Sequence, residues 1–424
     1  MSQRPVEVPA ARIAVGVFLP FAFGYFLSYL SRVVNAVIAD DLSADIGVDS
    51  AGLGVLTAAY FIAFAAFQLP LGVLLDRYGA RRVESALLVI AGLGALGFAF
   101  ADSMAGLTAA RALIGLGVSA CLMAAFKANI LWWPIERLPL MNGLILTCGG
   151  IGALTASTPV AALLSITDWR GVFVVLAVLM FACSGWLLVS LKEPPQPRPE
   201  EPETLAGQIA VLGQIFGRLK FWRVAAGTVP VQSVGMAYLS LWAAEWARVV
   251  DGASETMVAI TQQNMAIGMT LGYAVTGVVT DRLARIGVRS ETVLAAASGL
   301  FIANLACLVT PGLSVGWAQW PLFAMFCTSS VLGYAILSHS FPGAVAGRVN
   351  TALNLLTFVL AFAVQSGAGG AIDLLVAGGF TVADAHHWVL VGLLLYCTAG
   401  YLVFIAPWLS GLIWRRGQSQ VPGE

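Results

Sequence analysis

Charged side chains are scarce in this sequence. Asp, Glu, Lys and Arg make up only 10% of the 424 residues, whereas soluble domains carry about 25%. Hydrophobic residues account for 59%, and the mean hydropathy is +0.87. A water-soluble globule of this length needs far more polar surface than this chain offers. The composition therefore predicts an integral membrane protein embedded in a lipid bilayer.

Residues that carry metal, nucleotide or redox chemistry are also few. The three histidines, His339, His386 and His387, lie near loops and are too few to indicate a metal site. The six cysteines all fall within apolar segments, as buried hydrophobic residues do. The sequence has no Gly-x-x-x-x-Gly-Lys loop for ATP, no basic patch for nucleic acid and no nucleophilic triad. We therefore expect no enzyme activity, cofactor or nucleic-acid partner.

Long apolar runs take the place of polar surface. Lipid-crossing segments must be helices or closed barrels, and a spanning helix needs about 20 apolar residues. The first run is too long to be the apolar part of a cleavable signal peptide. The sequence predicts an all-α protein with twelve spans, near 12–38, 51–75, 83–101, 105–133, 140–166, 170–191, 221–247, 257–280, 291–310, 316–340, 345–378 and 387–413.

The largest interruption lies between the sixth and seventh runs. The segment Lys192–Glu203 is rich in proline and charge and cannot form a core. We predict an N-terminal six-helix bundle over 1–191, a cytoplasmic linker over 192–220 and a C-terminal six-helix bundle over 221–424. Within the linker, Leu205–Lys220 is expected to form an amphipathic surface helix.

The basic residues predict the orientation of the spans. Of the 22 Lys and Arg residues, 17 lie in the termini, the central linker or the even-numbered loops. The other five are Arg32, Arg111, Lys127, Arg170 and Arg248. Because basic loops stay in the cytoplasm, both termini are predicted to be cytoplasmic, in a bacterial-type inner (plasma) membrane.

The chain contains an internal repeat. A Gly-x-x-x-Asp-Arg segment follows the second span and recurs after the eighth, each time with further basic residues behind it. The first copy contains Gly72, Asp76, Arg77, Gly79, Arg81 and Arg82, and the second contains Gly277, Asp281 and Arg282. A proline eight residues before an asparagine also recurs, as Pro134 with Asn142 and Pro342 with Asn350. Two matched landmarks predict duplicated halves, a recurrent plan of transporters.

These motifs resemble a known family. The segment 72–82 resembles the loop signature of the major facilitator superfamily, and Arg111-x-x-x-Gly115-x-Gly117 resembles its fourth-span motif. The segments 127–137, 142–143 and 169–173, with Tyr29-x-x-Arg32-x-x-Asn35, resemble the organophosphate and anion:cation symporter branches. The resemblance implies twelve transmembrane helices in two six-helix bundles with pseudo-two-fold symmetry. It also implies a monomeric secondary transporter that works by alternating access.

The signature loop has a physical interpretation. Asp76 can accept hydrogen bonds from the N-terminus of a neighbouring helix, and the arginines can pair with acidic residues when the cytoplasmic side closes. The repeat in the second half would act in the same gating role. The alternative is that these arginines only keep the loop in the cytoplasm. In both interpretations the loop does not contact substrate.

Arg32 is the first candidate for substrate binding. A charge inside a span is costly and usually faces a cavity. At 100° per residue, Tyr25, Ser28, Tyr29, Arg32 and Asn35 fall within about 120° of one face of the first span. The alternative is that Arg32 extends to the outer membrane interface.

Lys127, in the fourth span, is a second binding candidate; the alternative is that it extends to the inner headgroups, with Trp132 and Trp133 as interfacial anchors. Arg111 lies on another side of that span, where we expect it to pack between helices. In the second half, Tyr238, Trp242 and Glu245 loosely mirror the first-span pattern, and we expect Tyr238 and Trp242 to contribute to substrate binding. A further set of amides, on the eleventh span, is predicted either to bind ligand or to join helices; it contains Asn350, Asn354 and Gln365.

The distribution of acids predicts the charge of the substrate. We expect no Asp or Glu deep within the first six spans, with Glu84 at the cytoplasmic edge of the third. A buried cation without a carboxylate attracts an anion, and arginine suits carboxylate or phosphate. The predicted substrate is therefore a small organic anion, taken up, symported or exchanged. Glu245 and Asp373 are the candidates for coupling to a co-transported proton.

Other functions stay open at this point. One is proton-driven export of a drug or metabolite, although the exporter pattern of the fifth span is only partly present at Thr158-Pro159 to Ala162. Another is a nitrate-like inorganic anion carrier, favoured by glycine clusters in spans five and eleven. A different class is a membrane scaffold or sensor that carries no substrate.

Overall fold

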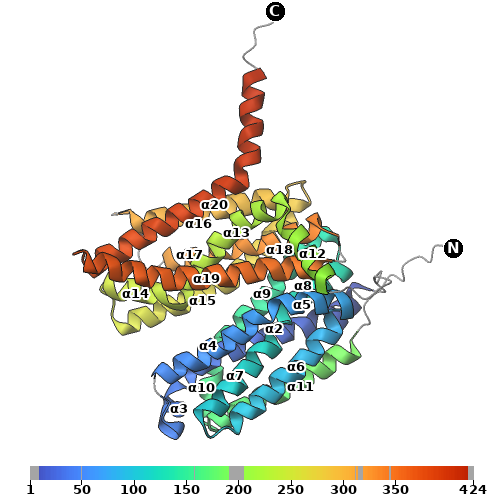
Figure 1. Cartoon of the computed structure of the whole chain (residues 1–424), viewed down its shortest axis with the longest axis vertical. Coiled ribbons are helices and arrows are strands. Elements are labelled where there is room, and N and C mark those ends of the chain that lie inside the picture. The colour runs from blue at the N-terminus through green and yellow to red at the C-terminus, as the bar shows by residue number, and fades with distance from the viewer. Residues whose placement is uncertain are drawn as a thin grey trace, which may run out of the picture. The chain divides into compact units, whose positions relative to one another are not determined.

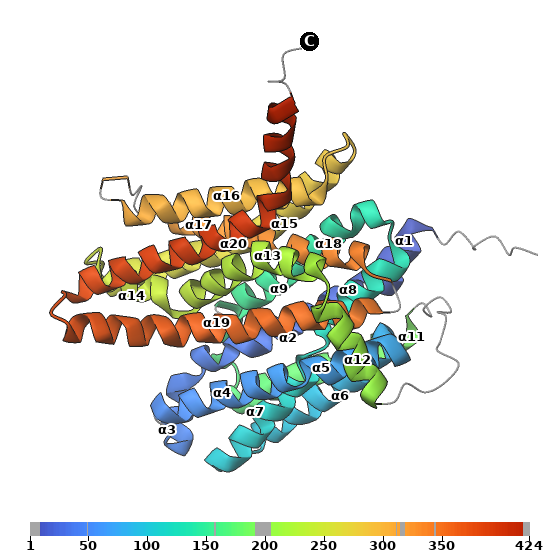
Figure 2. The same cartoon turned by 45° about the horizontal axis from the view of Figure 1, so that its top comes forward.

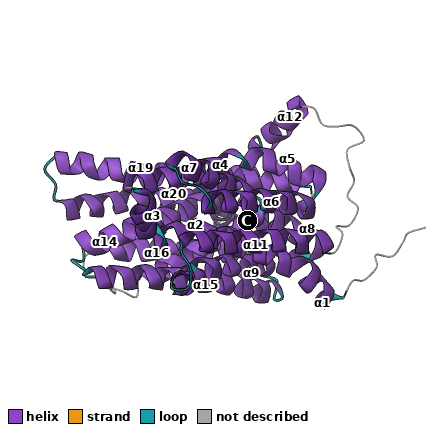
Figure 3. Ribbon diagram, turned by 90° about the horizontal axis from the view of Figure 1, so that it is seen from below, coloured by secondary structure: helices purple, strands orange, loops and turns teal. Residues whose placement is uncertain are grey.

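The computed structural model describes residues 9–48, 50–156, 158–190, 205–310, 312–313, 319–342 and 345–418. Figure 3 shows helices joined by loops, and these ranges contain no strand. Residues 192–204 of the predicted linker lie outside the described part, as do 1–8 and 419–424 of the predicted cytoplasmic termini. The all-α expectation is confirmed for the ranges that the structure describes.

The helices follow one another along the whole chain. The first group is α1 (Ala10–Ile13), α2 (Leu19–Val37), α3 (Ala39–Ile46), α4 (Ser50–Ala66), α5 (Gln68–Tyr78), α6 (Ala80–Ala99), α7 (Met104–Val118), α8 (Cys121–Trp132), α9 (Leu138–Thr155), α10 (Thr158–Leu164), α11 (Trp169–Val189) and α12 (Leu205–Phe216). The second group is α13 (Leu219–Ala237), α14 (Ala243–Val249), α15 (Glu255–Ala284), α16 (Ser290–Val309), α17 (Gln319–Cys327), α18 (Leu332–Ser340), α19 (Ala346–Ala377) and α20 (Val382–Gln418). Short π-helical turns occur at Ala14–Phe18 and Tyr238–Trp242, and 3₁₀ turns at Ile135–Arg137 and Thr328–Val331.

Ten helical segments of the described part are long and apolar enough to cross a membrane. An eleventh span arises if α4 and α5 are taken together, as a pair bent by 52°. The bend falls at Phe67, just before Pro70, whose ring disfavours a continuous helix. The remaining predicted span, 257–280, lies within α15. That helix has 30 residues, but Gln262, Gln263 and Asn264 lower its hydropathy.

The contacts of the chain define two compact units. One contains Met1–Leu212, Tyr273–Asp281 and Phe341–Leu355, and the other contains Gly213–Gly272, Arg282–Ser340 and Leu356–Glu424. Short pieces of α15 and α19 therefore pack within the first unit. The predicted bundle boundaries at 191 and 221 stay predictions.

In the first unit, α6 packs against α7 and α11, α2 against α9, and α4 against α7 (Figure 1). Local signals fix the ends of these helices. The side chain of Ser103 accepts a hydrogen bond from the Gly106 amide at the start of α7, and Asp168 accepts one from Gly171 at the start of α11. The turn between α5 and α6 depends on Gly79, whose φ of 83° is open mainly to glycine.

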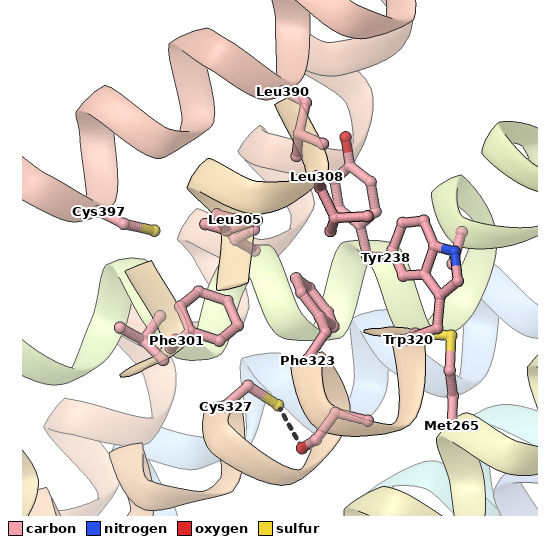
Figure 4. Close-up of a cluster of buried hydrophobic side chains, with 14 of the residues drawn as sticks. Tyr238, Met265, Phe301, Leu305, Leu308, Trp320, Phe323, Cys327, Leu390 and Cys397 are labelled. Carbon is pink, nitrogen blue, oxygen red and sulfur yellow. Dashed lines mark hydrogen bonds between the residues drawn. The ribbon is translucent and has the colours of Figure 1, made fainter. Parts of the chain in front are cut away.

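In the second unit, α13 and α16 pack against α20, and α17 packs against α16 (Figure 2). Aromatic and aliphatic side chains from these helices form a buried hydrophobic cluster (Figure 4). The ring of Phe323 lies 4.9 Å from that of Phe301 and 5.7 Å from that of Trp320, measured between centroids. This cluster forms the core of the second unit.

Candidate functional site

The polar stripe predicted on the first span lies on α2, in the interior of the first unit. Tyr25 is only 4% exposed, and its ring meets that of Tyr29 edge-on at 5.2 Å between centroids. The two rings fit because α9 has glycine at position 149. A Cβ there would lie 2.5 Å from the Tyr25 ring and 2.9 Å from the Tyr29 ring. Glycine at position 149 therefore allows the close contact between α2 and α9.

The guanidinium of Arg32 lies against three aromatic rings. Its central carbon is 4.6 Å from the ring centroid of Tyr29, 5.5 Å from that of Phe64 and 5.6 Å from that of Phe61. Such cation–π contacts stabilise a cation within a partly desolvated site. Arg32 is partly buried, so its charged group lies where α2 meets α4. We call Arg32 with these three rings the aromatic cage.

Asn35 lies one helical turn from Arg32 on the same face. Its side chain is buried at 6% exposure, and both the oxygen and the nitrogen of its carboxamide have no hydrogen-bond partner in the described part of the chain. Buried polar groups in folded proteins are nearly always satisfied. An amide beside the aromatic cage is therefore available to a ligand.

Arg111 of α7 has a structural role near the cage. Its guanidinium donates a hydrogen bond of 3.0 Å to the backbone carbonyl of Ser31 and lies 4.9 Å from the centroid of the Tyr60 ring. Tyr60 in turn donates its hydroxyl proton to the Ser28 carbonyl at 3.4 Å. The prediction that Arg111 packs between helices is confirmed. Its bonds to α2 hold the stripe in place.

Asp76, from the signature loop, forms a buried charge cluster. Lys127 donates to its Oδ1 at 2.5 Å, and the guanidinium of Arg348 donates to its Oδ2 at 3.1 Å. The backbone amides of Gly347 and Arg348, at the start of α19, also donate to this carboxylate, at 3.0 and 3.3 Å. Asp76 therefore accepts hydrogen bonds from a helix N-terminus, as its position predicts, in a geometry that the helix dipole favours.

These contacts change the interpretation of Lys127. Its side chain is 1% exposed and is held by Asp76, so neither the headgroup alternative nor an open binding site describes this conformation. The substrate-binding role stays a prediction. Of the loop arginines, Arg81 donates to the backbone carbonyls of Leu188 and Ser190 at the end of α11, and the pairing of these arginines with acidic residues stays a prediction. Arg77 lies 5.3 Å from the centroid of the adjacent Tyr78 ring, on an exposed surface.

The amides predicted on the eleventh span join helices. Asn354 donates to the side-chain oxygen of Gln68 at 3.0 Å, and both residues are buried in the first unit. In the second unit, the side-chain oxygen of Gln365 accepts a hydrogen bond from the Ser240 hydroxyl at 3.3 Å, and its backbone carbonyl accepts one from the indole of Trp242 at 3.2 Å. The alternative of helix-to-helix bonding thus describes these contacts, and the ligand role of Asn354 and Trp242 stays a prediction.

Tyr238 lies in the hydrophobic cluster of the second unit (Figure 4). Its ring stacks on Trp320 at 6.0 Å between centroids, and only 2% of the residue is exposed. The geometry gives Tyr238 a packing role, and its binding role stays a prediction. Tyr238 begins the π-helical turn that ends at Trp242, and such turns often mark functional positions.

The predicted coupling residues have ordinary surroundings. Glu245 forms an ion pair of 2.7 Å with Arg248, which also pairs with Glu255 at 2.9 Å. Asp373 is exposed on α19.

Of the repeat residues, Gly277 and Asp281 are buried and Arg282 is exposed. The part of the chain that the structure describes has no group of three or more His, Cys, Asp or Glu residues that could hold a metal ion.

Glu84 lies near one end of its span, as expected, since it is the fifth residue of α6. The sequence did not show that its side chain is buried at 0% exposure, so the first six spans do contain a buried acid. Helices α2, α8 and α11 supply the neighbours that bury it. Phe61, Phe64 and Gln68 were also overlooked. Their spacing of three and seven residues puts them on one face of the second span, which is the signal that could have found them.

A family comparison agrees with these features. The model of the Major Facilitator Superfamily matches residues 21–366, which is well over half of the chain. The protein is thus a multi-pass membrane transporter with the major facilitator fold, and it belongs to the major facilitator superfamily.

Several curated transporters are similar in sequence. The chain is 22% identical to a probable L-galactonate transporter of Escherichia coli K12 over 412 residues, 89% of each protein. It is 26% identical to a probable sulfoacetate transporter of Cupriavidus necator over 165 residues, which is 39% of this chain and 38% of that protein. It is also 26% identical to the hexuronate transporter of E. coli K12 over 216 residues, 48% of this chain and 50% of that protein.

Solved structures show the same fold at low identity. A crystal structure of the E. coli fucose:proton symporter matches with a TM-score of 0.70 and 15% identity, over 91% of this chain and 97% of that one. A structure of a proton:xylose symporter matches with a TM-score of 0.65 and 13% identity, over 95% and 96% of the two chains. These likenesses concern the fold alone.

Proposed function

We propose that this protein transports a small organic anion across the membrane by alternating access, and that the anion binds on α2 at Arg32. The observation that carries the proposal is the pairing of a cation and an unsatisfied amide. Within the aromatic cage, the Arg32 guanidinium lies 4.6 Å from the centroid of the Tyr29 ring. The buried carboxamide of Asn35 lies one helical turn away and has no hydrogen-bond partner in the described part.

The chemistry of these groups fits a carboxylate. A guanidinium presents a planar set of N–H donors that matches two carboxylate oxygens, and such charge-assisted hydrogen bonds are among the strongest in proteins. The Asn35 amide adds two further donors and an acceptor for hydroxyl groups. The rings of Tyr25 and Tyr29 suit the organic body of the substrate, since an aromatic face packs well against carbon while the hydroxyl stays polar.

The names of the relatives support an acidic substrate. Sulfoacetate, L-galactonate and hexuronate, which name three of the relatives, all carry a carboxylate group. Because two of these alignments span half or less of the relative, substrate identity rests on the site rather than on the names. We also propose that the protein belongs to the organophosphate or anion:cation symporter branch. In this proposal it lies in an inner membrane with both termini in the cytoplasm.

The signature loop would gate the pathway. In this proposal, Asp76 with Lys127 and Arg348 stabilises the conformation in which the start of α19 is held against α5. Moving the start of α19 away from α5 would separate this buried carboxylate from the Arg348 guanidinium and two backbone amides, and the energy that this costs would be a barrier between conformations. Trp242 and Asn354 remain candidates for ligand contact in other states of the cycle.

A transport assay with purified protein tests the proposal. Proteoliposomes preloaded with a hexuronate, a hexonate or sulfoacetate are mixed with the same labelled anion, and exchange is followed with fucose and xylose as neutral comparisons. We expect exchange of at least one of the anions and none of the neutral sugars. Arg32→Gln should lower that exchange by about tenfold or more, because one hydrogen bond to a charged group is worth about 1.5–3 kcal/mol.

The control is Arg218→Gln, which removes an exposed arginine at the start of α13 and should keep most of the exchange. Both variants must be inserted and monodisperse in detergent. Exchange by Arg32→Gln at the wild-type rate, or a preference of the wild type for the neutral sugars, would refute the proposal.

A further inference from the structure

Glu84 is a buried acid that the proposed substrate site does not use. It is the fifth residue of α6, about 6 Å along the helix axis from the signature loop. The residue is 0% exposed, and neither carboxyl oxygen has a hydrogen-bond partner among the described residues. An ionised carboxylate in such a place is very costly unless it is paired. An ionisable residue inside the bundle of a transporter is by default a functional candidate.

The pocket around Glu84 is built to hold its carboxyl group. Position 24 on α2 is glycine, and a Cβ there would overlap with Oε1 of Glu84. The carboxyl therefore reaches from α6 to the backbone of α2. On the next position of α6, Ser85 is hydrogen-bonded to Ser184 of α11 at 2.8 Å, which joins the two helices beside Glu84 without contacting its carboxyl group.

The titratable groups that face Glu84 are two thiols, Cys121 of α8 and Cys183 of α11. A neutral thiol supplies no countercharge. The cations on the helices around α6 bond to other groups: Lys127 and Arg348 to Asp76, Arg111 to the Ser31 carbonyl, Arg81 to the Leu188 carbonyl, and Arg170 to Asp45 and Asp102. The surroundings therefore suit the neutral, protonated carboxyl.

We propose that Glu84 is the proton-binding residue that couples anion transport to a proton gradient. The proposal rests on the proposed function, since it names the coupling site of that carrier. In the conformation described, Glu84 holds a proton in a dry pocket. The only bond made or broken in the step is the O–H bond of the carboxyl group, and the proton is exchanged with water.

The coupling follows from which helices close the pocket. An ionised Glu84 needs water or a cation, so α2 or its neighbours must move before the proton can leave. The same helix α2 carries Tyr25, next to Gly24, and Arg32, about 12 Å further along the axis. A shift of α2 that admits water to Glu84 therefore also disturbs the stripe that binds the anion. Proton release and anion release become linked through one helix.

The two acids that the sequence favoured fit this role less well. Glu245 is already neutralised by Arg248 at 2.7 Å, and Asp373 is exposed. When either of these acids loses its proton, the new charge is paired or exposed to solvent, whereas the charge on a fully buried carboxyl is not. Of these three carboxyl groups, Glu84 is thus the one whose protonation is most closely tied to its burial.

An experiment with the full-length protein in proteoliposomes distinguishes proton coupling from transport itself. Two assays are run with the labelled anion that the wild type exchanges best: exchange without a gradient, and net uptake driven by an inward proton gradient. A gradient of about one pH unit can support about tenfold accumulation when one proton accompanies one anion. We expect Glu84→Gln to keep exchange within about twofold of the wild type and to lose that accumulation.

The control is Ser85→Ala, an equally buried neighbour on α6, which should keep gradient-driven accumulation. Full accumulation by Glu84→Gln would overturn the proposal, as would loss of exchange and accumulation together in a well-folded variant. If that variant does not insert, Glu84→Asp serves instead and should accumulate with a shifted pH profile; an unchanged profile would overturn the proposal. Absence of anion exchange by the wild type would instead refute the proposed function.

Discussion

The carboxamide of Asn35 is buried beside Arg32 with no hydrogen-bond partner in the residues that the structure describes. An unsatisfied buried polar group costs about 1–3 kcal/mol of folding stability. A site that binds a polar ligand tolerates this cost because the ligand completes the hydrogen bonds. The residue should therefore matter to transport and not to stability.

Replacing Asn35 tests this directly. Asn35→Leu removes the unsatisfied amide at similar volume, so the melting temperature in detergent should stay equal or rise while anion exchange falls by about tenfold. Asn129→Leu is the matched control. Asn129 is equally buried but donates to Asn142 at 2.9 Å, so its loss should lower the melting temperature. Destabilisation by Asn35→Leu as large as that of the control would contradict the assignment.

Part of the site follows from helical spacing alone. Tyr25, Tyr29, Arg32 and Asn35 lie on one face because 100° per residue dictates it, and the structure places them in one stripe. The partners of those residues do not follow, because Phe61 and Phe64 come from α4, which the sequence alone cannot align with α2. The burial of Glu84 was missed for the same reason. Its burial depends on α2, α8 and α11, three helices distant in sequence.

Helices α2 and α9 pack closely at Gly149. The Tyr25 and Tyr29 rings occupy the space that a side chain at position 149 would need. Gly149→Ala should therefore displace both rings and reduce anion exchange several-fold, with the protein still inserted. A displacement of about 1 Å at a binding group is enough to cost function on this scale.

The matched control is Gly185→Ala in α11, where an added Cβ would meet nothing within 4 Å. Alanine favours a helix over glycine by about 1 kcal/mol, so this variant should be as active as the wild type and at least as stable. If Gly149→Ala behaved like the control in the exchange assay, the rings would have no part in binding.

Helix boundaries were only partly predictable. Long apolar runs locate most of the helices, because length and hydropathy are enough to define a span. The 52° bend between α4 and α5 depends on how the two segments pack, and Pro70 alone does not fix its angle. In α15, three consecutive amide residues lower the hydropathy, so the span is recognised from its 30-residue length and its place in the repeat.

At the scale of the molecule, the signature loop was the strongest evidence in the sequence. Its glycine, aspartate and basic residues identified the superfamily before any coordinates, and the family match over residues 21–366 confirms it. The substrate could not be predicted from a sequence motif in the same way. A fold shared by sugar symporters at 15% and 13% identity leaves the ligand to a few side chains, so the charge of the site decides the substrate class.

The account depends on a preference for negative charge that resides in Arg32. The most direct test is calorimetric titration of the purified protein with the anion it exchanges best and with the matching neutral compound in which an alcohol or amide replaces the carboxylate. The wild type should bind the anion roughly 10- to 150-fold more tightly, as expected for about 1.5–3 kcal/mol from one charged hydrogen-bond partner, and Arg32→Gln should lose the difference. Equal affinity of the wild type for both compounds, or an unchanged preference in Arg32→Gln, would contradict the account.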